Sequence, residues 1–279
     1  MSELNSKIEI YIPQSLKGLV DVIGQHISHY PSHMLALPNS KVEIMFILEG
    51  SQFEQFHIDK NKSKFLPNDT NKSVMVFSSQ TRPVEAEFKN LNVMTVVMNP
   101  IAAIAILGIP AWEIKDLHFE PNTLPHLNGI QDALNTLPTF QQRAKYLEKY
   151  LFQQLIKSRY LNQTQQKIRG MQMLLGEKNS ILNETELNFD HLYYSKSHFN
   201  RVCRDWLGVT YREYQLHKKF RKAMYAINNK NQSLTQIAYD LKYYDQAHFT
   251  RTFKKFAGVS PSEYRSSNKG QIPEFIILK

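Results

Sequence analysis

The chain has 279 residues, a formal net charge of +9 and a single cysteine, Cys203. One cysteine excludes an internal disulfide and a multi-cysteine metal site. The longest apolar run, 101–107, falls far short of the roughly 20 residues of a membrane helix. The first residues lack the apolar core of a secretion signal, so we expect a cytoplasmic globular protein with no membrane association.

The charge is unevenly distributed along the chain. Residues 1–164 contain 15 Lys+Arg and 15 Asp+Glu, whereas residues 165–279 contain 19 and 10, a net +9. This asymmetry indicates a neutral module joined to one that meets a polyanion, although a merely solvated basic face is the alternative. We therefore predict two domains, 1–164 and 165–279.

Short apolar segments separated by turn residues fill the first 120 positions. They are Ile8–Ile12, Val42–Leu48, Phe53–Ile58, Ser73–Phe77, Val84–Phe88 and Val93–Met98. Segments of this length between Pro, Asn and Gly predict an antiparallel β-barrel or sandwich. Because an apolar barrel can bind a small molecule, Phe46, Phe56, Phe77 and Trp112 are candidate pocket residues, with simple core packing as the alternative.

A helical stripe follows between residue 139 and about 163, formed by Ala144, Leu147, Leu151, Leu155 and Tyr160. It leaves two explanations open: the helix packs on the sheet, or it forms a homodimer interface. The polar segment 162–166 is the predicted linker to the second domain.

The C-terminal region contains an internal repeat with an offset of 50 residues. When 183–214 is placed over 233–264 without gaps, 11 of 32 pairs are identical, far above the two or three expected by chance. Each copy predicts two helices around a tight turn, at about 183–207 and 233–257. Asn183 and Ser233 begin capping boxes, and Ser195 and Asp245 are the predicted N-caps of the second helices.

The second helix of each copy is amphipathic. Phe249, Phe253 and Phe256 lie on one face in the second copy, as Phe199, Cys203 and Trp206 do in the first. The opposite faces combine amide, hydroxyl, Arg and Lys side chains. Amides and guanidinium groups recognise base edges and lysines neutralise phosphates, so these helices are typical of major-groove recognition.

The stretch Ile237-Ala238, 245–255 and 258–265 resembles the AraC/XylS family of bacterial transcription regulators, and the first copy with 208–214 supports the match. The N-terminal half resembles the cupin-like sensor domains of the same family. The resemblance implies an α+β protein: a mostly antiparallel β N-terminal domain with helices, and an all-α tandem helix-turn-helix domain. It also implies that Tyr211–Asn228 is a long connector, about 27 Å in length at 1.5 Å per residue.

By match to the family pattern, two sets of residues are expected to contact double-stranded DNA. The predicted base contacts are Ser197, Asn200, Arg201, Gln246, Ala247, Thr250 and Arg251. The predicted phosphate contacts are Lys196, Arg204, Lys254 and Lys255. RNA polymerase and an unidentified small-molecule effector are further candidate partners, and activation of transcription is one expected outcome.

The sequence departs from the family pattern in several places. Lys242 stands where the family has a turn glycine, and if it takes positive φ the strain costs on the order of 1 kcal/mol. Cys203 replaces a usual Phe, and Tyr211 occupies the position that Pro261 has in the second copy. The first unit is therefore the more divergent of the two.

No enzymatic function is predicted. Cupin enzymes hold a metal with several His and a Glu on neighbouring strands, but His26, His29 and His33 are expected on a loop or helix, and no His-x-His pair lies on a predicted strand. We expect no metal and no cofactor. The leading hypothesis is a sequence-specific DNA-binding transcription regulator with a sensing or dimerising first half. The alternative is a DNA-binding protein whose N-terminal domain is purely structural.

Overall fold

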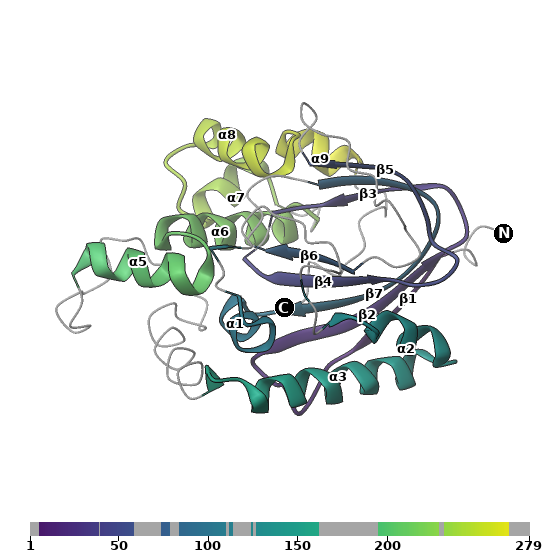
Figure 1. Ribbon diagram of the computed structural model, residues 1–279. Helices are drawn as coiled ribbons and strands as arrows, with labels where there is room; N and C mark the ends of the chain where they lie inside the picture. Colours follow the sequence, from purple (N-terminus) through teal and green to yellow (C-terminus); the bar gives the residue numbers. More distant parts are fainter. Residues whose placement is uncertain are drawn as a thin grey trace.

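The computed structural model describes residues 6–38, 40–58, 74–78, 84–109, 112–113, 124, 127–161, 195–228 and 232–267, with only the backbone of 32–36, 53–58, 78 and 84–86. Among the described residues, the strands lie between 6 and 98 and the helices between 100 and 267 (Figure 1). The strands are β1 Ser6–Tyr11, β2 Val20–Ser28, β3 Ser32–Ala36, β4 Val42–Ile47, β5 Gln52–Ile58, β6 Val74–Ser78 and β7 Val84–Met98. The helices are α1 Pro100–Leu107, α2 Ile130–Thr136, α3 Phe140–Lys157, α5 Lys196–Leu207, α6 Tyr211–Asn228, α7 Leu234–Asp240, α8 Gln246–Ala257 and α9 Pro261–Ser267. The predicted α+β class is confirmed.

The sheet is antiparallel and built around β7. The C-terminal half of β7 pairs with β2 and β4, and its N-terminal half pairs with β3 and β5. The path β1-β2-β7-β4-β6 completes the order. One 15-residue strand therefore serves two sets of neighbours, and Met94, Val96 and Met98 of its C-terminal half lie in the main apolar cluster.

Three strand predictions needed correction. Val84–Phe88 and Val93–Met98 are one continuous strand rather than two. β2 and β3 were not predicted, because Gly24, Gln25 and His26 interrupt the apolar pattern of β2. His26 lies on β2 and His33 on β3, so the expectation of a loop or helix at these two positions was wrong. His26 accepts or donates a hydrogen bond at 2.9 Å with Ser6 Oγ, and burial lowers the pKa of its imidazole.

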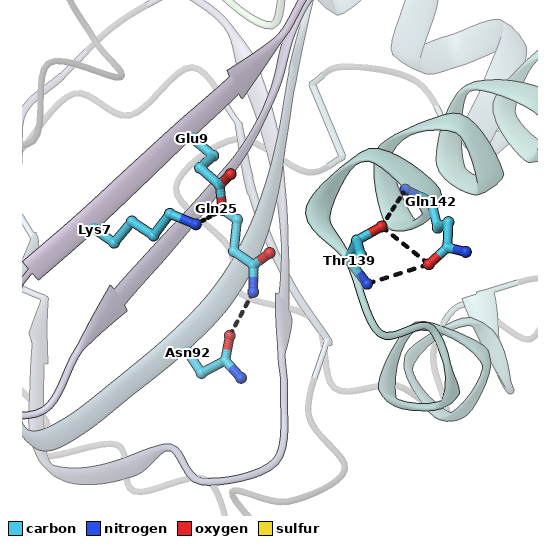
Figure 2. Close-up of polar contacts among 6 residues, drawn as sticks. All are labelled: Lys7, Glu9, Gln25, Asn92, Thr139 and Gln142. Carbon is cyan, nitrogen blue, oxygen red and sulfur yellow. Dashed lines mark hydrogen bonds and ion pairs between the residues drawn. The ribbon is translucent and has the colours of Figure 1, made fainter.

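Helix α3 packs on the sheet with the predicted stripe. Ala144, Leu147, Leu151 and Leu155 are buried in the same cluster as the strand side chains, and α3 runs alongside β1 and β2 (Figure 1). Its start is fixed by a capping box, in which Thr139 and Gln142 bond each other's backbone N–H (Figure 2). The helix ends at Lys157, before Tyr160. The apolar stripe of α3 therefore packs against the sheet of the same chain.

Side-chain contacts add to the backbone pairing of the sheet. Gln25 of β2 donates to Asn92 Oδ1 of β7 at 2.8 Å, and Lys7 pairs with Glu9 on the surface of β1 (Figure 2). Gln25 is buried, so this bond satisfies an amide that has left water. It adds a side-chain contact to the backbone pairing of β2 with β7.

The candidate pocket residues do not share one environment. Phe46 and Phe77 are buried, and Phe46 lies within the apolar cluster that α3 covers. Trp112 is 54% exposed on a turn after α1, so it is not a buried lining residue. The side chain of Phe56 lies outside the described residues. Core packing thus accounts for Phe46.

Candidate nucleic-acid interface

Helix α8 has the predicted ends and the predicted two faces. The Asp245 carboxylate accepts a hydrogen bond from the His248 backbone N–H at 2.5 Å, and Gly258 ends the helix at φ 75°. Glycine suits that end because the left-handed conformation carries no Cβ penalty. Phe249, Phe253 and Phe256 are buried. The outer face exposes Gln246, Ala247, Arg251, Lys254 and Lys255, with Thr250 half-buried.

Helix α5 repeats this design. Ser195 Oγ accepts from the His198 backbone N–H at 3.2 Å, and Gly208 ends the helix at φ 74°. Phe199 and Cys203 are buried, whereas Trp206 is half-buried. Its outer face exposes Lys196, Ser197, Arg201 and Arg204. The two helices therefore present basic, polar surfaces of the same construction.

The turn before α8 adopts the left-handed conformation at Lys242, the residue that stands where the family pattern has a turn glycine. Lys242 has φ 55°, the one non-glycine residue with positive φ among the residues the structure describes. Its carbonyl accepts a hydrogen bond at 3.2 Å from Lys219 Nζ, which also lies 5.3 Å from the Tyr243 ring centroid. Connector helix α6 thus holds the turn in place.

Helix α7 begins as predicted but completes its capping box differently. Ser233 Oγ accepts from the Gln236 backbone N–H at 3.1 Å. The Gln236 side chain does not return this bond to Ser233; it donates to Asp240 Oδ1 at 2.7 Å. Half of the predicted box is formed, and the cap itself is sufficient to start the helix.

The two units end in matching capping arrangements. Thr210 N–H donates to Glu213 Oε2 at 2.8 Å before α6, and Ser260 N–H donates to Glu263 Oε2 at 2.7 Å before α9. The hydrogen bonds from Ser260, helped by nearby Lys254, lower the pKa of the Glu263 carboxyl against a small opposing effect of burial. Pro261 is the first residue of α9, as its missing N–H predicts.

The buried side chains beneath α8 and α5 differ, since a cluster of aromatic rings surrounds Phe253 and a cysteine replaces it in the first unit. Phe253 contacts the rings of Phe220, Phe249 and Tyr264, with centroids 5.1 to 5.9 Å apart. The first unit instead packs Cys203 with Phe199 and Tyr211. Burial raises the pKa of the Cys203 thiol to about 12, so this cysteine is a small core residue without nucleophilic character.

Two amide side chains predicted to contact bases already have partners within the protein. Asn200 Oδ1 accepts from the Tyr211 backbone N–H at 3.3 Å, and its Nδ2 donates to the Lys196 carbonyl at 3.3 Å. Gln246 Oε1 accepts from Thr235 Oγ1 at 2.8 Å. The role of Asn200 was not predicted, but the sequence held a signal: Tyr211 carries the N–H that Pro261 lacks at the equivalent position.

The N-terminal region touches both units. Leu37 lies in the buried cluster of the second unit, and Ile101 of α1 lies in that of the first. A third contact reaches the connector: Ser40 Oγ and His217 Nδ1 of α6 are 3.1 Å apart in a buried hydrogen bond. The His217 ring also packs edge-on against Phe256, at 5.1 Å between centroids. Leu37 and Ser40, which lie between β3 and β4, and Ile101 of α1 thus connect the N-terminal region to the connector and to each core.

Several predictions lie outside the described residues: the first helix of the first unit with its Asn183 capping box, and the linker at 162–166. Within the described ranges, no group of three or more His, Cys, Asp or Glu side chains is arranged to hold a metal ion. No helix in the same ranges has the length and apolarity to cross a bilayer.

Comparison with known proteins identifies the helical region. Residues 190–267 match the family model described as "Helix-turn-helix domain". No curated protein matches the sequence.

Three solved structures illustrate the likenesses across the chain. ToxT from Vibrio cholerae O395 is 13% identical over 95% of this chain and 99% of its own, with a TM-score of 0.45. An unsaturated fatty acid bound wild-type ToxT from V. cholerae is 14% identical over 98% and 99%, with a TM-score of 0.44. A cupin domain of an XRE family transcriptional regulator from Enterobacter cloacae is 12% identical over 34% of this chain and 98% of its own, with a TM-score of 0.26.

Proposed function

We propose that the protein is a transcription regulator that recognises a specific DNA sequence with α5 and α8, since residues 190–267 match a helix-turn-helix domain family. The observation that carries the proposal is the paired construction of these helices. Each has a side-chain N-cap, an αL glycine at its end, a buried face and an exposed face of Arg, Lys and small polar residues.

The division of labour on each exposed face follows from side-chain chemistry. Arg201 and Arg251 carry planar guanidinium groups, which donate in pairs to guanine O6 and N7. Lys196, Arg204, Lys254 and Lys255 are exposed and suit the phosphates on either side of the groove. Ser197, Ala247 and Thr250 are small enough to let the helix approach the base edges. We place Asn200 among positioning residues, since its amide caps α6.

The length of connector α6 would allow one protein molecule to place α5 and α8 in two adjacent major-groove segments. Its 18 residues give a length of about 27 Å, and successive major-groove segments on one face of DNA lie about 34 Å apart. A modest bend of the duplex closes the difference. One protein molecule thereby suffices for two boxes, and a homodimer is not required.

We further propose that residues 1–164 form a domain that regulates the geometry of residues 165–279 through Leu37, Ser40 and Ile101. A buried aliphatic side chain in each core and a hydrogen bond to His217 favour direct coupling. A small-molecule effector bound by the first domain would act through these contacts. The burial of Phe46 and the exposure of Trp112 favour the second candidate, a purely structural first domain.

Selection from a random duplex library across a salt series tests the function. The proposal predicts an enriched site of about 20 base pairs containing two boxes roughly one turn apart. Affinity that falls with salt while no sequence is enriched would instead indicate a protein that binds phosphates without specificity.

The coupling is tested on the selected site with the spacer between the boxes varied. The intact protein should prefer one spacing, and Leu37→Ala combined with Ser40→Ala should broaden that preference while each box is still recognised. An unchanged spacing preference would leave the first domain in the structural role. Melting-temperature shifts with a panel of metabolites then separate an effector-binding domain from one without an effector.

A further inference from the structure

Two tyrosines of the second unit are more exposed than any other large apolar side chain that the structure describes. Tyr244, in the turn before α8, is 92% exposed, and Tyr239 of α7 is 79% exposed. A single exposed tyrosine is ordinary on a protein surface. These two lie only five residues apart, so the surface around the turn that leads into α8 presents two phenol groups to water.

The backbone on both sides of Tyr244 is held in place. The Lys242 and Tyr243 N–H groups each donate to a carbonyl of α7 at 2.9 Å. The Tyr243 ring is buried and lies 5.2 Å from the ring of Phe249, between centroids. Asp245, the next residue, caps α8. Tyr244 therefore stands on a fixed turn, and ordering it against a partner restricts only the two χ angles of its side chain.

The docking of a helix-turn-helix unit brings this turn close to the DNA backbone. In such units the first helix crosses the sugar–phosphate backbone, and the N-terminal residues of the second helix reach the base edges. Tyr244 lies between Asp240, the last residue of α7, and Gln246, the first residue of α8. When the second unit is docked in this way, position 244 lies between the strand that α7 crosses and the groove that α8 enters.

A phenol suits the sugar–phosphate backbone. Its O–H donates to a phosphate oxygen, and its ring offers an apolar face to the deoxyribose. The internal repeat distinguishes the two tyrosines, because Tyr244 aligns with Tyr194 whereas Tyr239 aligns with Phe189. Both copies thus have a hydroxyl at the turn position, but only the second has one on the first helix. This difference favours Tyr244 as the hydrogen-bond donor.

We propose that the Tyr244 hydroxyl donates a hydrogen bond to a DNA phosphate beside the box that α8 recognises. The contact anchors the second unit without adding charge and without recognising a base. It differs in this respect from the contacts proposed for Lys254 and Lys255, whose ammonium groups release counterions from DNA. The inference rests on the proposed function, because it requires α8 to enter a major groove.

The experiment uses the full chain and the duplex selected with it. Tyr244→Phe removes only the hydroxyl and should weaken binding roughly fivefold to the selected site and to each of its single-base variants. The slope of log affinity against log salt should stay unchanged in Tyr244→Phe, whereas Lys254→Gln should reduce its magnitude by about 0.9. Tyr239→Phe is the matched control and should bind as the unaltered protein does.

Ethylation interference locates the phosphate. Ethylation of the contacted phosphate should weaken binding of the unaltered protein far more than binding of Tyr244→Phe. That phosphate should flank the box whose recognition Arg251→Ala relaxes. Because the Tyr244 side chain is exposed, Tyr244→Phe should melt within a few degrees of the unaltered protein, which separates a lost contact from a lost fold.

Three results would overturn the inference. The first is a Tyr244→Phe variant that binds as tightly as the unaltered protein. The second is an equal loss of affinity in Tyr244→Phe and Tyr239→Phe, and the third is a loss of preference at one base position in Tyr244→Phe. All three leave the proposed function standing, because a specific site has been found. A library that yields no enriched sequence is different, since it removes the proposed function together with the inference.

Discussion

Helices α5 and α8 share a capped, two-faced design but differ at the positions where they meet the rest of the molecule. In the second unit, Phe253 fills the core and Pro261 begins α9 without an N–H. In the first, Cys203 and Tyr211 occupy these positions. Because Tyr211 has an N–H, Asn200 turns its amide inward to accept it. The residue at the first position of α6 therefore determines whether the side chain at position 200, predicted to contact DNA, has a backbone N–H to bind.

A repeated sequence thus need not repeat its contacts. Thr250, the counterpart of Asn200, has no N–H to cap at the start of α9, because Pro261 stands there. Gln246 is oriented by Thr235 from within its own unit. We therefore expect the second unit to provide more of the sequence specificity and the first unit more of the anchoring.

The largest expected difference concerns the cores. Phe253→Ala removes a ring packed among three others and should lower the free energy of unfolding by about 3–5 kcal/mol. Cys203→Ala removes one small group and should cost about 1 kcal/mol. Urea denaturation of both variants measures the two values. Equal losses would show that the aromatic cluster contributes no more than the small core of the first unit.

The next effect is on specificity. Arg251→Ala should lower affinity for the selected duplex by about 1–3 kcal/mol and relax recognition in one box. Arg201→Ala should do the same in the other box, with the smaller loss, since Arg201 Nη2 also lies 3.2 Å from His198 Nδ1. Competition binding with single-base variants gives both values. If Arg201→Ala leaves specific affinity unchanged while Arg251→Ala abolishes it, the first unit does not recognise bases.

A smaller effect tests the inward amide. Asn200→Ala leaves the first N–H of α6 without its side-chain acceptor, which should destabilise the protein by about 1 kcal/mol. The matched variant Thr250→Ala should change stability by less than about 0.5 kcal/mol. Thermal melting compares the pair. A stable Asn200→Ala variant that has lost base discrimination would return Asn200 to the role first predicted for it.

The smallest expected effect is a gain. Lys242→Gly relieves the left-handed strain at φ 55° and should raise stability by about 0.5–1 kcal/mol. Lys255→Gly, inside α8, is the control and should lower stability by a similar amount. A loss of stability in Lys242→Gly would mean that the Lys242 side chain is needed for the turn. The hydrogen bond and ring contact that Lys219 makes with this turn would then depend on it.

The helical region was predictable because its signals are local. Caps at Ser195, Ser233 and Asp245, the αL glycines and the buried faces all follow from residues within one or two turns of each other. The connector matched its expected bounds of 211–228, which came from the family resemblance. The missing turn glycine marked Lys242 as a position to examine, but the sequence left open whether its φ is positive.

The sheet was harder to predict because its evidence is non-local. β2 is buried along much of its length and lacks the apolar–polar alternation that marks a half-exposed strand. Its buried Gln25 is satisfied by Asn92, 67 residues away. The contacts of Leu37 and Ile101 with the C-terminal cores depend on how the two regions dock, which no local pattern reports.

The central claim is that one chain places α5 and α8 in adjacent major-groove segments of one duplex. Hydroxyl-radical footprinting of the selected site with the full chain tests it most directly. The account predicts two protected segments on the same face, about one helical turn apart, with the segment under α8 lost in Arg251→Ala. A single protected segment that Arg251→Ala removes entirely would contradict it.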